Sequence, residues 1–218
     1  MTDPILCTIQ GNIGAGKSCL VRQLKLSLEA VGKKVCFLQE PVDSIWSTIK
    51  DENGEPILSL YYKDQEKYAF SFQMMAYISR LSILKKALSQ DYDIIIAERS
   101  LSTDRHVFAQ MLRDENKIKH VEHEIYLRWF DEFQNDFPDE KVVYLKTTPE
   151  TASARVTKRA REGESIPLEY LANCHQYHEN WLAKKDDVLV LDGNVDIDVD
   201  PSYSTKRIAD VADFISRG

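Results

Sequence analysis

Residues 11–18 read Gly11-Asn12-Ile13-Gly14-Ala15-Gly16-Lys17-Ser18, and they follow directly after the apolar run Ile5–Gln10. Two glycines that are separated by four residues and followed by Lys and Ser form the P-loop pattern. Glycines let backbone N–H groups turn inward around phosphate groups, and a helix that begins near Lys17 adds its positive end to the same anion. The stretch therefore predicts a nucleotide phosphate site between a buried strand and a helix.

The chemistry of this loop assigns roles to its last two residues. Lys17 is expected to reach the β- and γ-phosphates of ATP, and the Ser18 hydroxyl is expected to bind Mg²⁺. The expected ATP-binding residues are Asn12, Gly14, Ala15, Gly16, Lys17, Ser18 and Cys19. The loop alone leaves open whether water, a nucleoside, a nucleotide or a protein accepts the phosphoryl group.

Apolar, β-branched runs alternate with longer stretches of helical pattern along the rest of the chain. This alternation predicts an α/β fold with a five-stranded parallel sheet flanked by helices on both faces. Strands are expected at Ile5–Gln10, Val35–Gln39, Asp93–Ala97, Val142–Lys146 and Val188–Leu191. Helices are expected at about Lys17–Ala30, Gln65–Gln90, His120–Phe133, Thr148–Ala160, Leu168–Lys185 and Ser204–Ser216.

Length and composition limit the class of protein. A chain of 218 residues, with 43% hydrophobic and 29% charged residues, is typical of one folded α/β domain, and we expect residues 1–218 to form it. The formal net charge of −7 argues against a nucleic-acid partner, because such proteins concentrate positive charge. Within this acidic chain, basic residues cluster at 155–161, where a P-loop kinase keeps its lid.

Cysteine use and the absence of apolar segments indicate the compartment. The four cysteines form no CxxC pair, so we expect reduced thiols that pack as small hydrophobes. The first residues, 1–11, show no signal or transit peptide, and no apolar stretch approaches the ~20 residues of a membrane span. We therefore expect a cytoplasmic protein without a membrane partner.

Charged residues end two of the predicted strands. Glu40 follows the second strand, and Glu98 with Arg99 follows the third. Ligands of open α/β sheets bind beyond the carboxyl ends of the strands, so these side chains should meet the P-loop. One carboxylate can take the proton of an attacking hydroxyl while a second holds Mg²⁺, and the arginine offsets charge on the transferred phosphoryl group. The alternative is that both carboxylates are solvated strand ends.

These motifs, taken together, resemble the deoxynucleoside kinase family, which includes deoxycytidine, deoxyguanosine and mitochondrial thymidine kinases. The similar segments run through almost the whole chain: GNIGAGKS at 11–18, QEPV at 39–42, YYKDQEKYAFSFQ at 61–73, ERSLSTDRHVF at 98–108, RVTKRAREGESIPLEYL at 155–171 and VLVLDGN at 188–194. The resemblance implies a P-loop kinase fold with an arginine-rich lid at about 155–166. It also implies a homodimer that phosphorylates deoxynucleosides with ATP and Mg²⁺.

The resemblance further implies roles at the reacting end of the acceptor. Glu40 corresponds to the general base for the 5′-hydroxyl, and Arg99 to its partner there. Glu98 corresponds to the carboxylate on the Mg²⁺ side. Arg159 and Arg161 correspond to lid arginines that close on the phosphates.

The remaining family positions concern the sugar and the base. Tyr62 and Glu164 correspond to the pair that binds the 3′-hydroxyl, with Glu162 as the alternative to Glu164. Gln73 corresponds to the amide that reads the base edge. Phe72 and Phe108 correspond to the aromatic walls that stack on the base.

The base preference can be predicted from one helix face. Gln73, Ala76 and Arg80 stand at i, i+3 and i+7, so all three should point into one pocket. A desolvated guanidinium needs a carboxylate, which Asp104 can supply. In the resembling family this pair marks enzymes that take deoxycytidine and purine deoxynucleosides. We therefore expect deoxycytidine, deoxyadenosine or deoxyguanosine to be used well and thymidine poorly.

Two other functions remain possible at this point. A nucleoside monophosphate kinase shares the P-loop, lid and sheet, but it must bind an acceptor phosphate that Glu40 would repel. A module that binds ATP without transfer would have no need of Lys17, Glu40, Glu98 and Arg99 together. A metal site at His120, His123 and Glu124 is disfavoured, because no further ligands lie nearby in the sequence.

Overall fold

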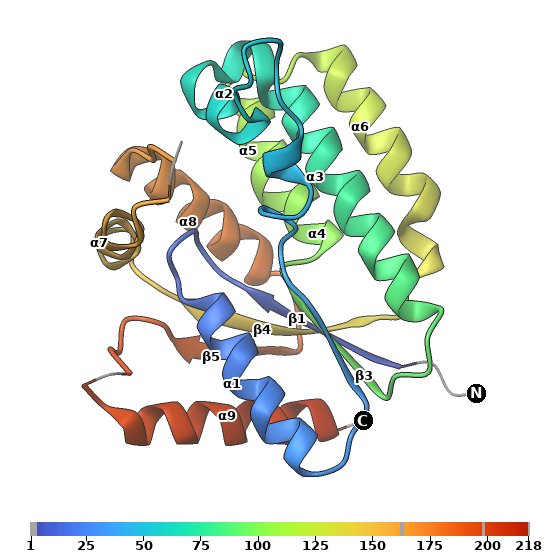
Figure 1. The fold of residues 1–218 in the computed structure, drawn as a ribbon, viewed down its shortest axis with the longest axis vertical. Coiled ribbons are helices and arrows are strands. Elements are labelled where there is room, and N and C mark those ends of the chain that lie inside the picture. Colours follow the sequence, from blue (N-terminus) through green and yellow to red (C-terminus); the bar gives the residue numbers. More distant parts are fainter. Residues whose placement is uncertain (1–3, 162–163, 198, 218) are drawn as a thin grey trace.

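The fold, seen in a computed structural model, is built on five parallel strands (Figure 1). The structure describes residues 4–161, 164–197 and 199–217. The strands lie in the order β2-β3-β1-β4-β5. Their bounds are β1 (Ile5–Gln10), β2 (Val35–Leu38), β3 (Ile94–Glu98), β4 (Glu140–Lys146) and β5 (Val188–Asp192).

Helices cover both faces of this sheet, as the alternation of the sequence predicted. The α-helices are α1 (Lys17–Ala30), α2 (Ile57–Lys63), α3 (Gln65–Leu88), α4 (Leu101–Thr103), α5 (Gln110–Asp114), α6 (His120–Phe133), α7 (Pro149–Arg159), α8 (Leu168–Leu182) and α9 (Pro201–Ser216). Short 3₁₀ segments are η1 (Trp46–Thr48) and η3 (Gln134–Asp136), and η2 (Asp104–Ala109) is a π-helix.

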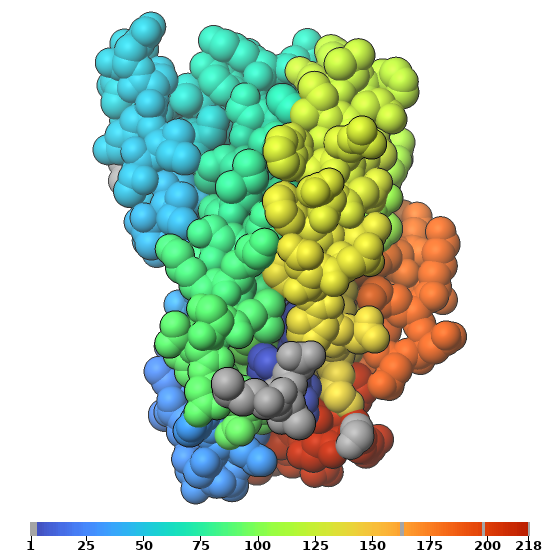
Figure 2. Space-filling view, turned by 90° about the vertical axis from the view of Figure 1, so that its right-hand side faces the viewer, coloured from blue at the N-terminus to red at the C-terminus, as the bar shows by residue number. Residues whose placement is uncertain are grey.

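The two faces of the sheet carry separate hydrophobic clusters. On one face α1 and α9 pack against β1, β3 and β4, in a cluster that includes Leu24, Phe214 and Ile9. On the other face α3 and α6 pack through residues such as Tyr77 and Tyr126. Successive residues of a strand point to opposite faces, so the central strands β1 and β3, which are buried at consecutive positions, contribute side chains to both clusters. Figure 2 shows α3 and α6 side by side on the outside of the molecule.

The predicted α/β fold is confirmed, and so are the five strands and six predicted helices. The bounds of β1, α1 and α6 are as predicted, and the others differ by one to three residues at their ends. Thr148 caps α7 by accepting a hydrogen bond from the backbone N–H of Thr151, and Pro149 takes the first helical position. These are the start signals that the sequence contains.

Apart from the short 3₁₀ segments, two helical regions in the described part of the chain were not predicted. The α2 helix has seven residues between Pro56 and Asp64, which is too short for a periodic pattern to be visible. The segment from α4 through α5 contains the π-helix η2, whose wider turn breaks the spacing of 3.6 residues. Both regions lie beside the site described below.

The parallel arrangement brings the carboxyl ends of β1, β2 and β3 to the same edge. The glycine-rich loop follows β1, Glu40 follows β2 and Arg99 follows β3, so the three sequence signals meet there. No helix in the described part of the chain is long and apolar enough to cross a membrane.

Candidate active site

The loop between β1 and α1 has the backbone that a phosphate cradle requires. Gly14 and Gly16 have φ angles of 82° and 95°, which residues with a Cβ atom rarely adopt. A Cβ on Gly14 would also lie 2.4 Å from the carbonyl oxygen of Ala152 in α7. The loop therefore packs directly against the helix that leads to the lid.

Lys17 is buried at the start of α1 and bends back over this loop. Its Nζ donates to the carbonyl oxygens of Gly11, at 3.2 Å, and Asn12, at 2.9 Å. Burial, together with the charge of Arg99, lowers the pKa of Lys17 from 10.5 to about 7, although Glu40 and Glu98 oppose the shift. Burial takes the ammonium of Lys17 away from water, which disfavours its charged form. An anionic ligand in the loop would favour the charged form again and raise the pKa.

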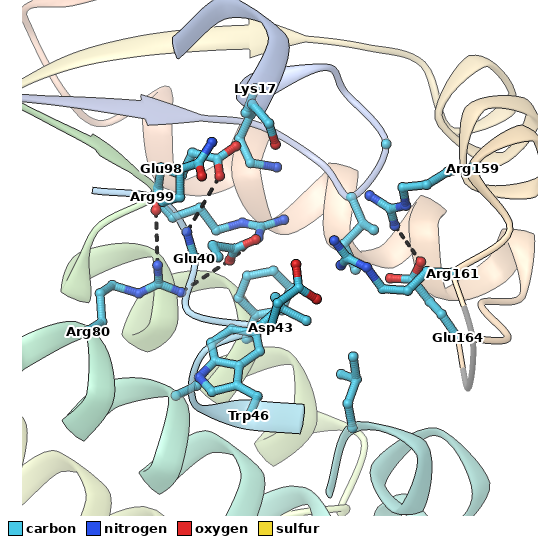
Figure 3. A pocket seen from close by; sticks show the side chains of 18 of the residues that line it. Lys17, Glu40, Asp43, Trp46, Arg80, Glu98, Arg99, Arg159, Arg161 and Glu164 are labelled. Carbon is cyan, nitrogen blue, oxygen red and sulfur yellow. Dashed lines mark hydrogen bonds and ion pairs between the residues drawn. The ribbon is translucent and has the colours of Figure 1, made fainter. Parts of the chain in front are cut away.

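Glu40 lies at the centre of a buried ion network (Figure 3). Its Oε1 accepts hydrogen bonds from Nη1 of Arg99 and from Nη2 of Arg80, the latter at 3.2 Å. The backbone N–H of Glu40 faces Oε2 of Glu98 at 3.5 Å. Burial would raise the pKa of Glu40, but Arg99, Arg80 and Lys17 together hold it well below the usual range. The carboxylate is therefore ionised at neutral pH.

Arg99 occupies a strained position directly after β3. Its φ angle of 62° lies in the left-handed region, which a non-glycine residue adopts at an energetic cost. The backbone N–H of Arg99 donates to the carbonyl oxygen of Ile9, which fixes this bend to β1. The guanidinium lies 5.0 Å from the ring centre of Phe108. The backbone hydrogen bond to Ile9 and the cation–π contact with Phe108 thus offset this strain and hold Arg99 over the cavity.

Arg80 and Asp104 form the ion pair that the helix-face argument predicted. Nε of Arg80 lies 2.9 Å from Oδ2 of Asp104, and Nη2 lies 3.3 Å from Oδ1. The pair is almost inaccessible, with side chains 6% and 2% exposed. Burial lowers the pKa of Arg80, but Asp104 and Glu40 raise it by more than that, so the pKa lies above its usual range. Arg80 therefore remains charged.

Aromatic side chains wall a cavity of about 490 Å³ above this network. Phe72 packs edge-on against Trp46 at 5.4 Å between ring centres, and Tyr61 stacks on Phe72 at 4.5 Å. Nε1 of Trp46 donates to Oγ of Ser79 at 2.9 Å, so the indole has a fixed orientation. Flat walls of this kind suit an aromatic ring as ligand.

Gln73 is the polar group at the end of this aromatic cavity. It is buried on α3, and its Oε1 has no hydrogen-bond partner within the described residues. A buried acceptor without a donor is costly, so this oxygen is available for a polar ligand edge. Ala76 lies on the same face, where its small side chain leaves the cavity open.

Tyr62 and Glu164 line the same cavity from α2 and from the segment before α8. Burial is the main reason why the pKa of Tyr62 lies well above 10, and the nearby Tyr61 and Glu164 raise it as well. The hydroxyl of Tyr62 therefore keeps its proton. In the described part of the chain Glu164 pairs with Arg159 and not with Tyr62. Glu162, the alternative to Glu164, lies outside the described residues.

Basic residues of α7 and of the segment directly after it face the cavity from the lid side. Arg155, Arg159 and Arg161 all line it. Nη1 of Arg155 donates to the carbonyl oxygen of Gly193 at 2.6 Å and to that of Ala15 at 3.3 Å. Arg155 therefore ties the glycine-rich loop to the turn after β5, whereas Arg161 extends over the cavity (Figure 3).

The cavity collects most of the predicted site residues. Its lining includes Gly14, Gly16, Lys17, Ser18, Cys19, Glu40, Tyr62, Phe72, Gln73, Ala76, Arg80, Glu98, Arg99, Asp104, Phe108, Arg159, Arg161 and Glu164. Two predicted residues are not part of the lining. The Asn12 side chain instead donates to the carbonyl oxygen of Leu171 at 2.8 Å, and Ala15 is packed in the core.

Further lining residues were not among the predicted site residues, although Arg155 belongs to the predicted lid segment. Trp46, Tyr170, Asp43 and Arg155 also face the cavity. The spacing of Arg155 and Arg159 at i and i+4 was a usable signal, because it places both on one side of α7. Asp43 and Trp46 follow β2 in an irregular segment, where no periodicity indicates direction.

The donor set at the glycine-rich loop suits Mg²⁺. Ser18 and Glu98 both line the cavity and offer a hydroxyl and a carboxylate oxygen, the hard ligands that this ion prefers. Magnesium usually takes its remaining oxygen ligands from phosphates and water. The residues present therefore fit the ion.

Comparisons with known proteins agree with this geometry. The family model described as deoxynucleoside kinase matches residues 7–216. The chain is 35% identical over 192 residues to a deoxycytidine kinase of Homo sapiens, which covers 80% of this chain and 74% of that protein. It is 32% identical over 237 residues to deoxycytidine kinase 2 of Gallus gallus, which covers 96% of this chain and 89% of that protein.

A mitochondrial deoxyguanosine kinase of Xenopus laevis is 30% identical over 198 residues, which cover 82% of this chain and 73% of that protein. Residues 7–216, which the family model matches, contain the glycine-rich loop, both strand-end carboxylates and the lid segment. Because the family model covers nearly the whole chain, the protein belongs to the deoxynucleoside kinase family.

Proposed function

We propose that this deoxynucleoside kinase transfers the γ-phosphate of ATP to the 5′-hydroxyl of deoxycytidine and purine deoxynucleosides in preference to thymidine. The observation that carries the proposal is the position of Glu40. Its ionised carboxylate is fixed by Arg99 and Arg80 at the junction of the phosphate loop and the aromatic cavity. A carboxylate at this junction can accept a proton from a hydroxyl that points towards the phosphates.

Each residue at the phosphate end has a part in the transfer. Glu40 takes the proton of the 5′-hydroxyl, and Arg99 orients that carboxylate. Lys17 holds the β- and γ-phosphates, and Arg159 and Arg161 add positive charge from the lid as charge develops on the phosphoryl group. Ser18 and Glu98 would hold Mg²⁺, which neutralises phosphate charge when bound.

The acceptor is recognised at its sugar and its base. We infer that Tyr62 and Glu164, which both line the cavity, bind the 3′-hydroxyl, and that Tyr62 packs against C2′ so that ribose fits less well than deoxyribose. Phe72 and Phe108 flank the base. The unpartnered Oε1 of Gln73 supports this assignment, because the amino group of cytosine or adenine can donate to it.

The ion pair of Arg80 and Asp104 sets the base preference. Asp104 can accept a hydrogen bond from the exocyclic amino group of cytosine, whereas thymine presents an acceptor, O4, at that point. Arg80 would also crowd the 5-methyl group of thymine. A buried group that is left unpaired or repelled costs roughly 1–3 kcal/mol, or about ten- to a hundredfold in discrimination.

The two other functions have less support. A nucleoside monophosphate kinase would place an acceptor phosphate against Glu40, and like charges repel in a buried site. A module that binds ATP without transfer does not require the buried network of Glu40, Arg80 and Arg99, whose desolvation is costly. The cytoplasmic location expected from the sequence stays a prediction.

We also propose that the protein is a homodimer through the outer surface of α3 and α6. Ile78, Val121 and Trp129 are 52%, 67% and 49% exposed there, and Ile125 adds to the same surface. Exposed apolar residues on two neighbouring helices are typical of a protein interface. A twofold axis would pair this surface with its own copy.

Replacement of Glu40 tests the catalytic assignment. Glu40→Gln keeps the size of the side chain and removes its ability to accept a proton, so kcat should fall by ~10² to 10⁴. The dissociation constant for deoxycytidine, measured by calorimetry, should change little in comparison. A variant with nearly normal turnover would rule out Glu40 as the base.

Nucleotide binding should take up a proton at alkaline pH. With a pKa of about 7, Lys17 is mostly neutral in the free protein at pH 8, and the phosphates of ATP favour its charged form. Binding should then take up about one proton, measured by calorimetry in buffers with different ionisation enthalpies. Lys17→Arg, which is always charged, should take up none. Binding without proton uptake in the wild type at pH 8 would contradict the assignment.

The double variant Arg80→Met plus Asp104→Ala tests the base preference. It removes the guanidinium that crowds the 5-methyl group of thymine and the carboxylate that repels O4. The ratio of kcat/KM for thymidine to that for deoxycytidine should therefore rise about tenfold or more. Initial rates with both nucleosides give the ratio. An unchanged ratio would show that other residues choose the base.

The proposed dimer can be tested with one charge. Trp129→Glu places a carboxylate in the apolar surface, and light scattering after size exclusion should then give a monomer mass. Leu26→Glu is the matched control, because Leu26 is 70% exposed on α1, across the sheet from α3 and α6, and should leave the dimer intact. A wild-type protein that is monomeric at micromolar concentration would refute the interface.

A further inference from the structure

The guanidinium of Arg80 contacts three functional groups at once. Nε and Nη2 bind the two carboxylate oxygens of Asp104, and Nη1 donates to the backbone carbonyl of Glu98 at 2.9 Å. Nη2 also donates to Oε1 of Glu40 at 3.2 Å. Asp104 alone would explain a pair that reads the base, but the bond to Glu40 reaches towards Lys17 and the glycine-rich loop (Figure 3).

The two carboxylate oxygens of Glu40 have different surroundings. Oε1 accepts from Arg80 and from Arg99. Oε2 accepts no hydrogen bond from the described residues. Arg80 from α3 and Arg99 from the end of β3 thus fix Oε1 and leave Oε2 open to a ligand.

The donors that fix Oε1 are themselves rigid. Arg80 projects from α3, and its planar fork is locked by Asp104 on one side and the Glu98 carbonyl on the other. Arg99 is held by its bend after β3 and by its contact with Phe108. With either arginine removed, the carboxylate could rotate about its last torsion, which has a broad minimum.

We propose that Arg80 is a positioning residue for the catalytic carboxylate as well as a reader of the base. By holding Oε1 it directs Oε2 of Glu40 towards the 5′-hydroxyl. Oε2 takes the hydroxyl proton as the 5′-oxygen bonds to the γ-phosphorus, while the bond from that phosphorus to the β,γ-bridging oxygen breaks and ADP leaves with its electron pair. The inference rests on the proposed function of Glu40.

One consequence follows for selectivity. The side chain that faces the base edge also aligns the proton acceptor, so a base that displaces Arg80 from Asp104 would disturb the alignment of Glu40. Selection of the base would then act on turnover as well as on binding. Small misalignments of this kind can lower rates strongly.

A double-mutant cycle separates this role from base reading. Arg80→Met is measured with saturating deoxycytidine and ATP, once with Glu40 present and once in the Glu40→Gln background. If Arg80 acts through Glu40, kcat should fall about tenfold or more in the first case and less than about twofold in the second. The change in KM should be similar in both backgrounds, because the base contact is lost in both.

Two further variants make the cycle decisive. Arg80→Lys keeps a positive charge beside Asp104, which protects the fold if Arg80→Met is too unstable, but it lacks the fork that spans both carboxylates. It should show the same dependence on Glu40. Gln73→Leu is the matched control: it alters the base contact but leaves the two donors that hold Oε1 of Glu40 in place, so its effect on kcat should be equal in both backgrounds.

The outcomes distinguish the inference from the function on which it rests. Equal losses of kcat for Arg80→Met and Arg80→Lys with and without Glu40 would overturn the positioning role and leave the proposed base in place. A Glu40→Gln single variant with nearly normal kcat would overturn both. A loss that disappears in the Glu40→Gln background supports the proposal.

Discussion

The carboxylate of Glu40, held between the guanidinium groups of Arg99 and Arg80, is the interaction on which the site depends. It connects the ends of β2 and β3 to the long helix α3, and it lies between the phosphate loop and the aromatic cavity. Because both arginines are buried, neither can follow a displaced carboxylate into solvent. The position of the proton acceptor is thereby set by the sheet and by one helix.

This network is stabilising only as a complete unit. Removing charged groups from water costs several kcal/mol for each ion, and the cost is offset when every donor and acceptor is paired. Asp104, the Glu98 carbonyl and Glu40 together satisfy most of the Arg80 donors. In the described part of the site, Oε2 of Glu40 and Oε1 of Gln73 accept no hydrogen bond, Nε of Arg99 donates none, and Lys17 has a low pKa. These residues line the cavity, where a substrate could complete such groups.

Sequence patterns reached much of this arrangement, for identifiable reasons. Strand periodicity and the glycine-rich loop place Lys17, Glu40, Glu98 and Arg99 at one edge, because parallel strands end together. The face of α3 that carries Gln73 and Arg80 follows from helical spacing. What could not be predicted depends on contacts between distant segments. The bond from Arg80 to Glu40 joins residues 40 positions apart, and no local pattern records it. Likewise Asn12 binds the carbonyl of Leu171 in α8, although its place in the loop suggested a phosphate contact.

Glu40 is proposed to take the proton of a deoxynucleoside hydroxyl, which makes that hydroxyl, and not a phosphate group, the acceptor of the phosphoryl group. This proposal is tested most directly by initial rates of ATP-dependent phosphorylation, measured side by side for deoxycytidine, deoxyadenosine, deoxyguanosine, thymidine and deoxycytidine monophosphate. The account predicts that deoxycytidine or a purine deoxynucleoside has the highest kcat/KM, that thymidine is poor and that the monophosphate is not phosphorylated. A protein that phosphorylates the monophosphate or thymidine best would contradict it.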